Sequence, residues 1–436
     1  PNDPNGTRLE LSKINGTIDF PDNSTIVTDS LKASYEGVNI NFTGNLWQGK
    51  VAAGKADPEA AVKRALAYES FLERLAFWHW PADSPPSIDI FAEGDINAPQ
   101  HIKLEFSGKA QSITRKNFTM EDLSISGDLS YNLVSVDSLE FKNMSSGELR
   151  SASLIGDFDL GSHAGRFRIE SDIHLKEFTR ELFDREILKG TKFRKSVFTA
   201  DGKFQIEKSM DEVPYASALP SFLTPFKGNQ ISLRGQAKLD DFSHLGADFD
   251  KITSDFSYNA GDLYLDDLLA RNSDGFLKAR LLIKDQKILF AAESTLPVKN
   301  YKPFFKKNAK LTEILAKVKF EMGSSCYFKS SGVINANDLT DWDADGSVEL
   351  KKVIYDKTYV VNKLSTKFAW KDKFLTTDLK LGGLQLGQTK LNKVETTLKW
   401  HQGILSLQNT SIEDRNIRIG EINTNIKEVD GALSGN

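Results

Sequence analysis

The chain has 436 residues, which corresponds to about three ordinary domains or to one long repetitive architecture. Its 56 basic residues nearly balance its 60 acidic residues, and the formal net charge of −4 offers no global basic field for nucleic acid or an anionic membrane surface. No apolar run approaches the ~18 residues of a membrane-spanning helix.

Two further features bound the class of protein. The sequence begins at Pro1 without a methionine or an apolar leader, so we expect a mature or excised piece of a longer protein. Cys326 is the single cysteine, which leaves no possibility of an intrachain disulfide or a cysteine zinc cluster. We interpret Cys326 as a small buried apolar group.

Apolar and polar residues alternate along many stretches of the chain, as in 88–91, 166–170 and 417–422, and this period is typical of half-buried strands. Turn residues such as Asp201-Gly202, Asp274-Gly275 and Lys371-Asp372-Lys373 lie between such stretches. The 28 phenylalanines also favour pleated surfaces. The sequence therefore predicts a mostly β chain built from hairpins.

Helical periodicity is confined to a few segments. The clearest is 57–78, with Asp57 as N-cap, Pro58 at the first helical position and apolar residues on one stripe. Weaker amphipathic candidates are 176–189, 210–223 and 302–317.

An internal repeat is the most informative feature. An apolar residue, a second one four positions later and an aromatic two positions beyond it recur, followed by a polar turn and another alternating strand. The five copies are Ile14/Ile18/Phe20, Ile125/Leu129/Tyr131, Ile252/Phe256/Tyr258, Leu364/Phe368/Trp370 and Val394/Leu398/Trp400. Helices placed before three of the hairpin groups predict four segments: an N-terminal hairpin segment 1–56 and three helix-plus-repeat units at 57–208, 209–302 and 303–436.

Hairpins repeated in this way predict an elongated, curled antiparallel sheet with a few amphipathic helices, because each hairpin satisfies the backbone edge of the previous one. The apolar face of such a sheet needs a cover. The sheet can fold over on itself as a sandwich, close as a barrel, or stay open as a taco-like trough covered by a ligand.

Signatures of enzymes and metal sites are weak. The six histidines lack metal-ligand spacing, and neither a nucleophile elbow nor a phosphate loop is present. We therefore expect a non-enzymatic protein with no catalytic residues, no metal and no cofactor. Asp341, Asp343 and Asp345 open like a calcium loop, but Lys352 occupies the position that should supply a glutamate, so an acidic turn before a strand is the favoured interpretation.

The hairpin phrases at 249–265 and 394–407 resemble the repeats of the AsmA-like family of bacterial envelope proteins, of the TamB and YhdP type. The resemblance implies a periplasmic, β-rich body tethered to the inner membrane by an anchor that this sequence lacks. It further implies a groove that holds or conducts phospholipid and contributes to outer-membrane lipid homeostasis or assembly, with possible envelope-protein partners at either end and no nucleic acid.

The groove positions that this hypothesis favours are the apolar and aromatic members of the repeats. They are Ile125, Leu129, Tyr131, Ile252, Phe256, Tyr258, Leu364, Phe368, Trp370, Val394, Leu398 and Trp400. The same residues would equally suit the closed core of a β-sandwich, so a structural or interaction rod of β-sandwich repeats in the cell envelope, without a lipid ligand, is the alternative.

Overall fold

The computed structural model divides the chain into two compact units, which are described separately. Unit 1 comprises Pro1–Leu188, Lys195–Tyr215 and Pro225–Gly235, and unit 2 comprises Lys189–Arg194, Ala216–Thr224 and Gln236–Asn436. The structure describes residues 12–35, 37–49, 78–98, 102–115, 118–130, 133–145, 147–159, 162, 164–174, 191–206, 229–244, 247–259, 262–297, 300, 317–320, 325–335, 341–356, 358–401, 404–414, 417–429 and 432–435.

The described residues are overwhelmingly β-strand, and helix is nearly absent among them. This confirms the mostly β prediction. The four predicted helices lie outside the described residues except for Trp78 and Lys317 at their ends. The chain changes from one unit to the other at several points between 188 and 236, which fall in both the predicted 57–208 and 209–302 segments, and the repeat boundaries themselves stay a prediction.

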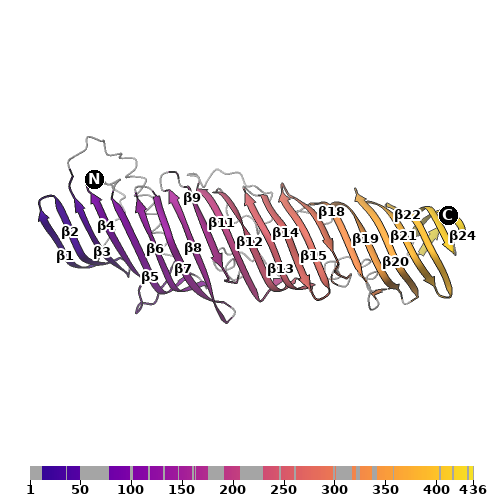
Figure 1. Ribbon diagram of the computed structural model, residues 1–436, viewed down its shortest axis with the longest axis horizontal. Helices are drawn as coiled ribbons and strands as arrows, with labels where there is room; N and C mark the ends of the chain where they lie inside the picture. The colour runs from indigo at the N-terminus through magenta and orange to yellow at the C-terminus, as the bar shows by residue number, and fades with distance from the viewer. Residues whose placement is uncertain are drawn as a thin grey trace. The chain divides into compact units, whose positions relative to one another are not determined.

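Unit 1 contains ten complete strands, which can be followed in chain order in Figure 1. They are β1 (Ser12–Asp22), β2 (Thr25–Tyr35), β3 (Val38–Trp47), β4 (Ser87–Asp95), β5 (Lys103–Arg115), β6 (Phe118–Ser130), β7 (Leu133–Ser145), β8 (Glu148–Asp159), β9 (Ala164–Ser171) and β11 (Lys195–Ile206). All neighbouring pairs from β1 to β9 are antiparallel except β3 and β4, which are parallel, and β11 pairs with β9.

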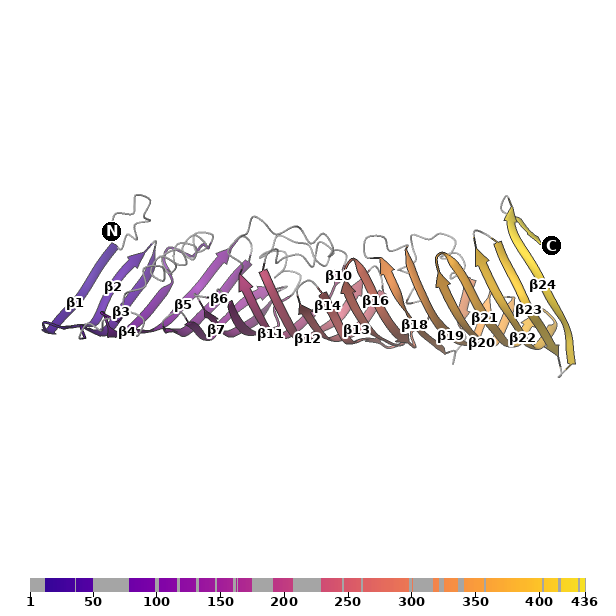
Figure 2. The same cartoon turned by 90° about the horizontal axis from the view of Figure 1, so that it is seen from above.

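Unit 2 is a second run of antiparallel strands (Figure 2). Its strands are β10 (Thr191–Lys192), β13 (Ala247–Asn259), β14 (Asp262–Asn272), β15 (Gly275–Lys284), β16 (Lys287–Ser294), β17 (Val318–Phe320), β18 (Cys326–Asn335), β19 (Trp342–Tyr355), β20 (Tyr359–Lys371), β21 (Phe374–Leu386), β22 (Thr389–His401), β23 (Ile404–Asp414), β24 (Ile417–Val429) and β25 (Ala432–Gly435). β12 (Asn229–His244) contributes residues to both units. β16 pairs with β18, and β17 pairs with β19.

Within each unit the described strands form a single layer. Substantial contacts between strands occur only between hydrogen-bonded neighbours. Buried apolar clusters are correspondingly small: Phe118, Ala152 and Ile173 form one in unit 1, and Ala247, Phe249, Ala270 and Leu296 form another in unit 2. The described part of each sheet is therefore open and has no second sheet packed on it.

Bulges interrupt many of the strands near their middles. Asp122 in β6, Asp267 in β14 and Asn409 in β23 lie at register shifts and have positive φ angles of 49°, 48° and 54°. An extra residue in this conformation bends the strand and increases its right-handed twist. These bulges supply local curvature, which agrees with the expected curl, and aspartate and asparagine are among the few residues that tolerate this conformation.

β1 differs from the other strands. All of its residues are exposed, including Ile14 and Phe20 at 62% and 68%, and it pairs only with β2 among the described strands. Its register with β2 shifts three times. The first copy of the repeat thus forms an irregular edge strand.

The bulge at Asp267 restricts which residues can occupy this position of β14, and the restriction can be tested. Replacing Asp267 with Val places a β-branched residue at positive φ, and we expect this change to lower the free energy of unfolding by about 1–2 kcal/mol. Asp266→Val is the matched control, because Asp266 is an exposed neighbour without a positive φ. The urea midpoints of the two variants measure the difference, and equal midpoints would contradict the role given to the bulge.

Candidate functional site

The candidate site is the apolar face of each sheet. In unit 2 one cross-strand row runs Phe256, Leu265, Leu281 and Phe290 over β13 to β16. Tyr258 lies opposite Leu263 on the same side. Successive side chains of a strand point to opposite sides, so these residues share one face. We call it the apolar face and the opposite one the polar face.

The apolar face continues across the later strands of unit 2. Leu364 lies opposite Leu350 and Leu381, Leu381 lies opposite Val394, and Val394 lies opposite Ile412. Trp370 and Trp400 both lie opposite Leu375.

Register places the remaining predicted positions of unit 2 on this face too. They are Ile252 of β13, Phe368 of β20 and Leu398 of β22. The structure therefore brings all nine predicted groove positions of unit 2 to one face.

Unit 1 has the same division of faces. Ile125 and Leu129 of β6 lie opposite Leu139 and Val134 of β7. On the other side of β6 they lie opposite Gly108 and Leu104 of β5. Tyr131 lies outside the described residues.

Glycines keep the apolar face smooth where an aromatic ring must lie across a neighbouring strand. Gly202 is the cross-strand partner of Phe167, and a Cβ on Gly202 would lie 2.4 Å from Cζ of that ring. Gly346 and Phe368 repeat the arrangement in unit 2, with 2.9 Å between the same two atoms. A ring that covers a strand glycine compensates for the missing side chain.

Small side chains follow one line of the apolar face in unit 2. Ala279, Ala292, Ser330 and Gly346 are successive cross-strand partners on β15, β16, β18 and β19. A hollow of about 600 Å³ follows this line, and Phe368 is also part of its lining. The larger apolar side chains on either side of the line remain only partly buried, as the face-forming Leu281, Phe290 and Val348 illustrate.

Aromatic rings stack where the strands end. The rings of Trp342 and Trp370 are 5.3 Å apart with an interplanar angle of 22°, and those of Trp370 and Trp400 are 5.7 Å apart at 19°. Phe328 and Phe368 stack at 6.5 Å deeper in the face. Three indoles thus line one rim of the apolar face of unit 2.

Two pairs of threonine hydroxyls on the apolar face bond to one another. Thr396 and Thr410 are both buried and their hydroxyl oxygens are 2.7 Å apart. Thr366 and Thr377 form a similar hydroxyl pair on β20 and β21. Paired hydroxyls cost little in an apolar setting, because neither is left without a partner.

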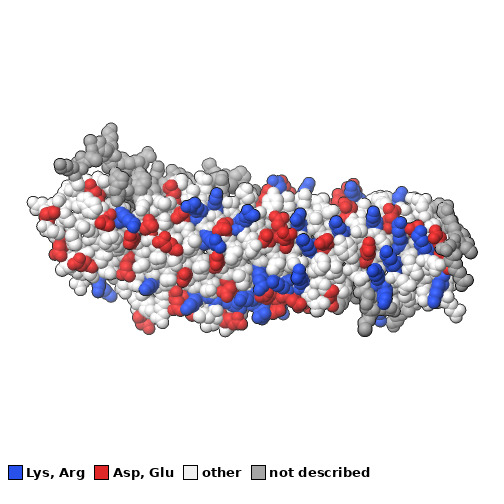
Figure 3. Space-filling model, viewed as in Figure 1, with Lys and Arg blue, Asp and Glu red and all other residues white. Residues whose placement is uncertain are grey.

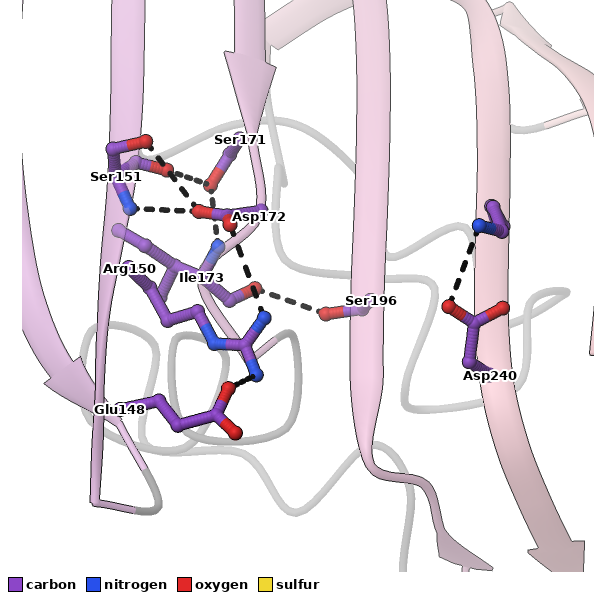
Figure 4. Close-up of polar contacts among 9 residues, drawn as sticks. Glu148, Arg150, Ser151, Ser171, Asp172, Ile173, Ser196 and Asp240 are labelled. Carbon is purple, nitrogen blue, oxygen red and sulfur yellow. Dashed lines mark hydrogen bonds and ion pairs between the residues drawn. The ribbon is translucent and has the colours of Figure 1, made fainter.

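In unit 1 the apolar face ends at a polar cluster around Arg150 (Figure 4). Arg150 lies opposite Asn143, its side chain is 9% exposed, and its guanidinium forms an ion pair with Glu148. Nη1 of Arg150 also lies 3.8 Å from Oδ2 of Asp172. Asp172 in turn accepts a 2.7 Å hydrogen bond from the backbone N–H of Ser151.

This cluster fastens the ends of three strands beside the buried Ile173. The N–H of Ile173 donates to Oγ of Ser171 at 3.1 Å, and Oγ of Ser196 donates to the carbonyl of Ile173 at 3.0 Å. Two carboxylates already surround the one guanidinium, so the cluster has no charge to offer an anionic ligand. It acts as a structural clamp at the edge of the core formed by Phe118, Ala152 and Ile173.

Cys326 lies on the apolar face opposite Leu350 and is buried. Burial raises the pKa of its thiol to about 11. The interpretation of Cys326 as a buried apolar group is confirmed.

The acidic segment that opens like a calcium loop forms the start of a strand. Asp343 and Asp345 belong to β19 and lie opposite Val333 and Ser331. Oδ1 of Asp343 accepts the N–H of Asp372, and Oδ2 of Asp341 accepts from the side-chain amide of Asn335. The predicted acidic turn is therefore wrong in detail, because the strand begins at Trp342. No cluster of three metal-ligating side chains occurs among the described residues.

Sequence reasoning missed Arg150, Asn143 and the buried threonines of the apolar face. Strict alternation places Arg150 in phase with Ala152 and Leu154, and this was the available signal for an inward-facing charge. Asp172, which lies near the guanidinium of Arg150, has no comparable local signal in the sequence that would predict this contact.

Comparison of the chain with protein-family models, with curated proteins and with solved structures gives no match. Within the described residues, no helix has the length and apolar character needed to cross a membrane.

Removal of the ion pairs of Arg150 should reduce the stability of the protein. We expect Arg150→Met to lower the free energy of unfolding by about 3 kcal/mol, because it leaves the partly buried Asp172 and the buried Asn143 without their charged neighbour. The control is Arg168→Met, whose ion pair with Glu170 is exposed and contributes at most about 1 kcal/mol. Urea unfolding of both variants provides the measurement, and a similar loss in the two would contradict the clamp.

The raised pKa of Cys326 predicts slow alkylation. The thiolate is the reactive form, and at pH 8 we expect roughly two-hundredfold slower reaction with iodoacetamide than for an exposed cysteine of pKa ~8.5. The rate should rise about tenfold for each pH unit up to pH ~11. A Cys326→Ser/Ser331→Cys variant supplies the exposed reference, and equal rates at pH 8 would show that the thiol is accessible.

Proposed function

We propose that this protein holds or conducts phospholipid acyl chains along the apolar face of its sheet. The main observation that supports this proposal is the open apolar face itself. Its aliphatic and aromatic rows run from strand to strand in each unit, its large side chains are only partly buried, and no second sheet covers it within the described residues.

The energetics suit an acyl chain. Each methylene removed from water contributes about 0.8 kcal/mol, so a strip a few side chains wide stabilises a bound chain by several kcal/mol. The hydroxyls of Thr396 and Thr410 on this face bond to each other, so covering them with hydrocarbon leaves neither of them without a partner. An open sheet also lets the head group of the lipid stay in water.

The proposed role is binding without covalent chemistry, and we assign no cofactor. Membership of the AsmA-like family, a periplasmic location, an inner-membrane anchor, envelope-protein partners and a contribution to outer-membrane lipid homeostasis or assembly belong to the same proposal. Their support is the repeated hairpin phrase, whose apolar members in unit 2 share one face. A taco-like closure of the sheet around the lipid is likewise part of the proposal.

A rod of β-sandwich repeats is the competing function. It requires paired sheets with dry cores. The single layer of described strands and the small size of the two buried clusters give this alternative less support.

Site-specific photo-crosslinking tests the proposal. A benzophenone amino acid at Phe256, on the apolar face of β13, should give a phospholipid adduct when the protein is irradiated in cells, because the side chain would touch the bound acyl chain. Mass spectrometry of the purified protein detects the adduct.

The matched control places the same crosslinker at Tyr264, which lies opposite Ser257 on the polar face and is 37% exposed. Adducts at Phe256 and not at Tyr264 are the expected result. Absence of lipid at Phe256, or equal labelling at both positions, would reject an acyl-binding face and leave the rod.

A further inference from the structure

The polar face of β20, β21 and β22 carries an unusual concentration of lysine. Register places six lysines on this side of the three strands, with Asp378 and Glu395 as the acidic residues among them. We call this set the lysine face: Lys363, Lys367 and Lys371 of β20, Lys380 of β21, and Lys393 and Lys399 of β22. Blue side chains gather over these strands at the right of Figure 3.

The two acidic residues among the lysines do not neutralise the positive charge of the lysine face. Glu395 is shared by two lysines, with Nζ of Lys393 at 2.9 Å and Nζ of Lys380 at 3.1 Å. The hydrogen bond from Lys393 makes the largest contribution to lowering the pKa of Glu395, and that from Lys380 lowers it further. Asp378 accepts from Oγ1 of Thr397 at 2.9 Å.

Four lysines of this face therefore carry charge with no ion pair among the described residues. They are Lys363, Lys367, Lys371 and Lys399. All of them lie at exposed or half-exposed positions.

Elsewhere on the polar face several cations are ion-paired, although Arg280 and Lys329 are not paired among the described residues. Lys142 lies 2.9 Å from Asp122, Lys284 lies 2.8 Å from Asp262, and Arg166 lies 2.8 Å from Asp157. On β20 to β22 six lysines of the polar face stand against two carboxylates, in a chain whose formal net charge is −4. A concentrated positive field on one area of sheet calls for an extended anionic partner.

We propose that the lysine face docks on the surface of an anionic lipid bilayer. The six cations are all lysines, which are hydrated point charges suited to diffuse attraction, whereas arginine would favour bidentate recognition of individual phosphates. On the polar side of the described part of these strands, Phe374 lies opposite Lys371 with its ring centroid 5.4 Å from that of His401. These aromatic groups are confined to the strand ends and form no continuous platform for the stacking of nucleic-acid bases.

The rim of the same strands suits a membrane interface. Lys371 and Lys399 are the immediate neighbours of Trp370 and Trp400, whose indoles belong to the stacked row at the strand ends. Tryptophan prefers the head-group region because its ring is apolar and its N–H is polar. Cations and indoles at one rim place both kinds of interfacial anchor together.

The charges that carry docking lie on the opposite side of the sheet from the apolar face, and docking and acyl binding share only the rim with Trp370 and Trp400. The test is sedimentation of the full chain with vesicles of phosphatidylcholine alone or of phosphatidylcholine mixed with phosphatidylglycerol. We expect binding to the mixed vesicles only, and loss of binding at high ionic strength, because salt screens exposed charges.

The decisive variant is Lys363→Gln/Lys367→Gln/Lys371→Gln/Lys399→Gln. Since each lysine near an anionic surface contributes roughly fivefold, we expect affinity for the mixed vesicles to fall by at least about a hundredfold. The matched control is Lys103→Gln/Lys142→Gln/Lys278→Gln/Lys284→Gln, which removes the same charge from ion-paired positions and should lose less than about fivefold.

Equal losses in the two fourfold variants, or equal binding of the wild type to neutral vesicles, would overturn the docking face. Tighter binding of the wild type to single-stranded DNA than to mixed vesicles would replace the bilayer with a soluble polyanion. The lipid adduct at Phe256 is scored separately, so failure of docking and failure of the acyl-binding face give different results.

Discussion

The two-residue period of the antiparallel strand is the constraint on which the rest of this structure depends. Hydrogen bonding fixes each strand against its neighbours, and alternation then commits every side chain to one of two faces. Leu281 and Arg280 are adjacent in sequence, yet one joins Phe290 on the apolar face while the other lies opposite Ala291 on the polar face. Both the acyl-binding proposal and the lysine face arise from this single division.

A sheet that exposes one apolar face must also keep that face even. Gly202 beneath Phe167 and Gly346 beneath Phe368 show how this is achieved, because a ring from one strand fills the space that the glycine leaves on the next. The threonine hydroxyl pairs likewise keep polar groups on this face satisfied, because each hydroxyl bonds to the other. Burial of Arg150 is the exception, and there two carboxylates and a set of backbone hydrogen bonds compensate for the charge.

Much of the fold could be predicted from the sequence, because alternation and turn chemistry are local. Asp274-Gly275 does connect β14 to β15, and Asp372-Lys373 connects β20 to β21 with both φ angles positive, as a two-residue hairpin requires. Asp201-Gly202 was predicted as a turn and instead lies inside β11, because its glycine accommodates the ring of Phe167. That demand comes from a strand about 35 residues earlier in the chain and has no local signal. The lysine face escaped notice for a related reason, since net charge averages over both faces and the whole chain.

The pattern of contacts also has a mechanical consequence. Described strands make substantial contacts only with their hydrogen-bonded neighbours, so most hairpins are held by the two elements beside them. No single described strand or buried cluster therefore holds all the others in place. Within each unit, tension would open the strands one after another, each step breaking one ladder and leaving the next intact, so that the work of extension would be spread over many small and similar events.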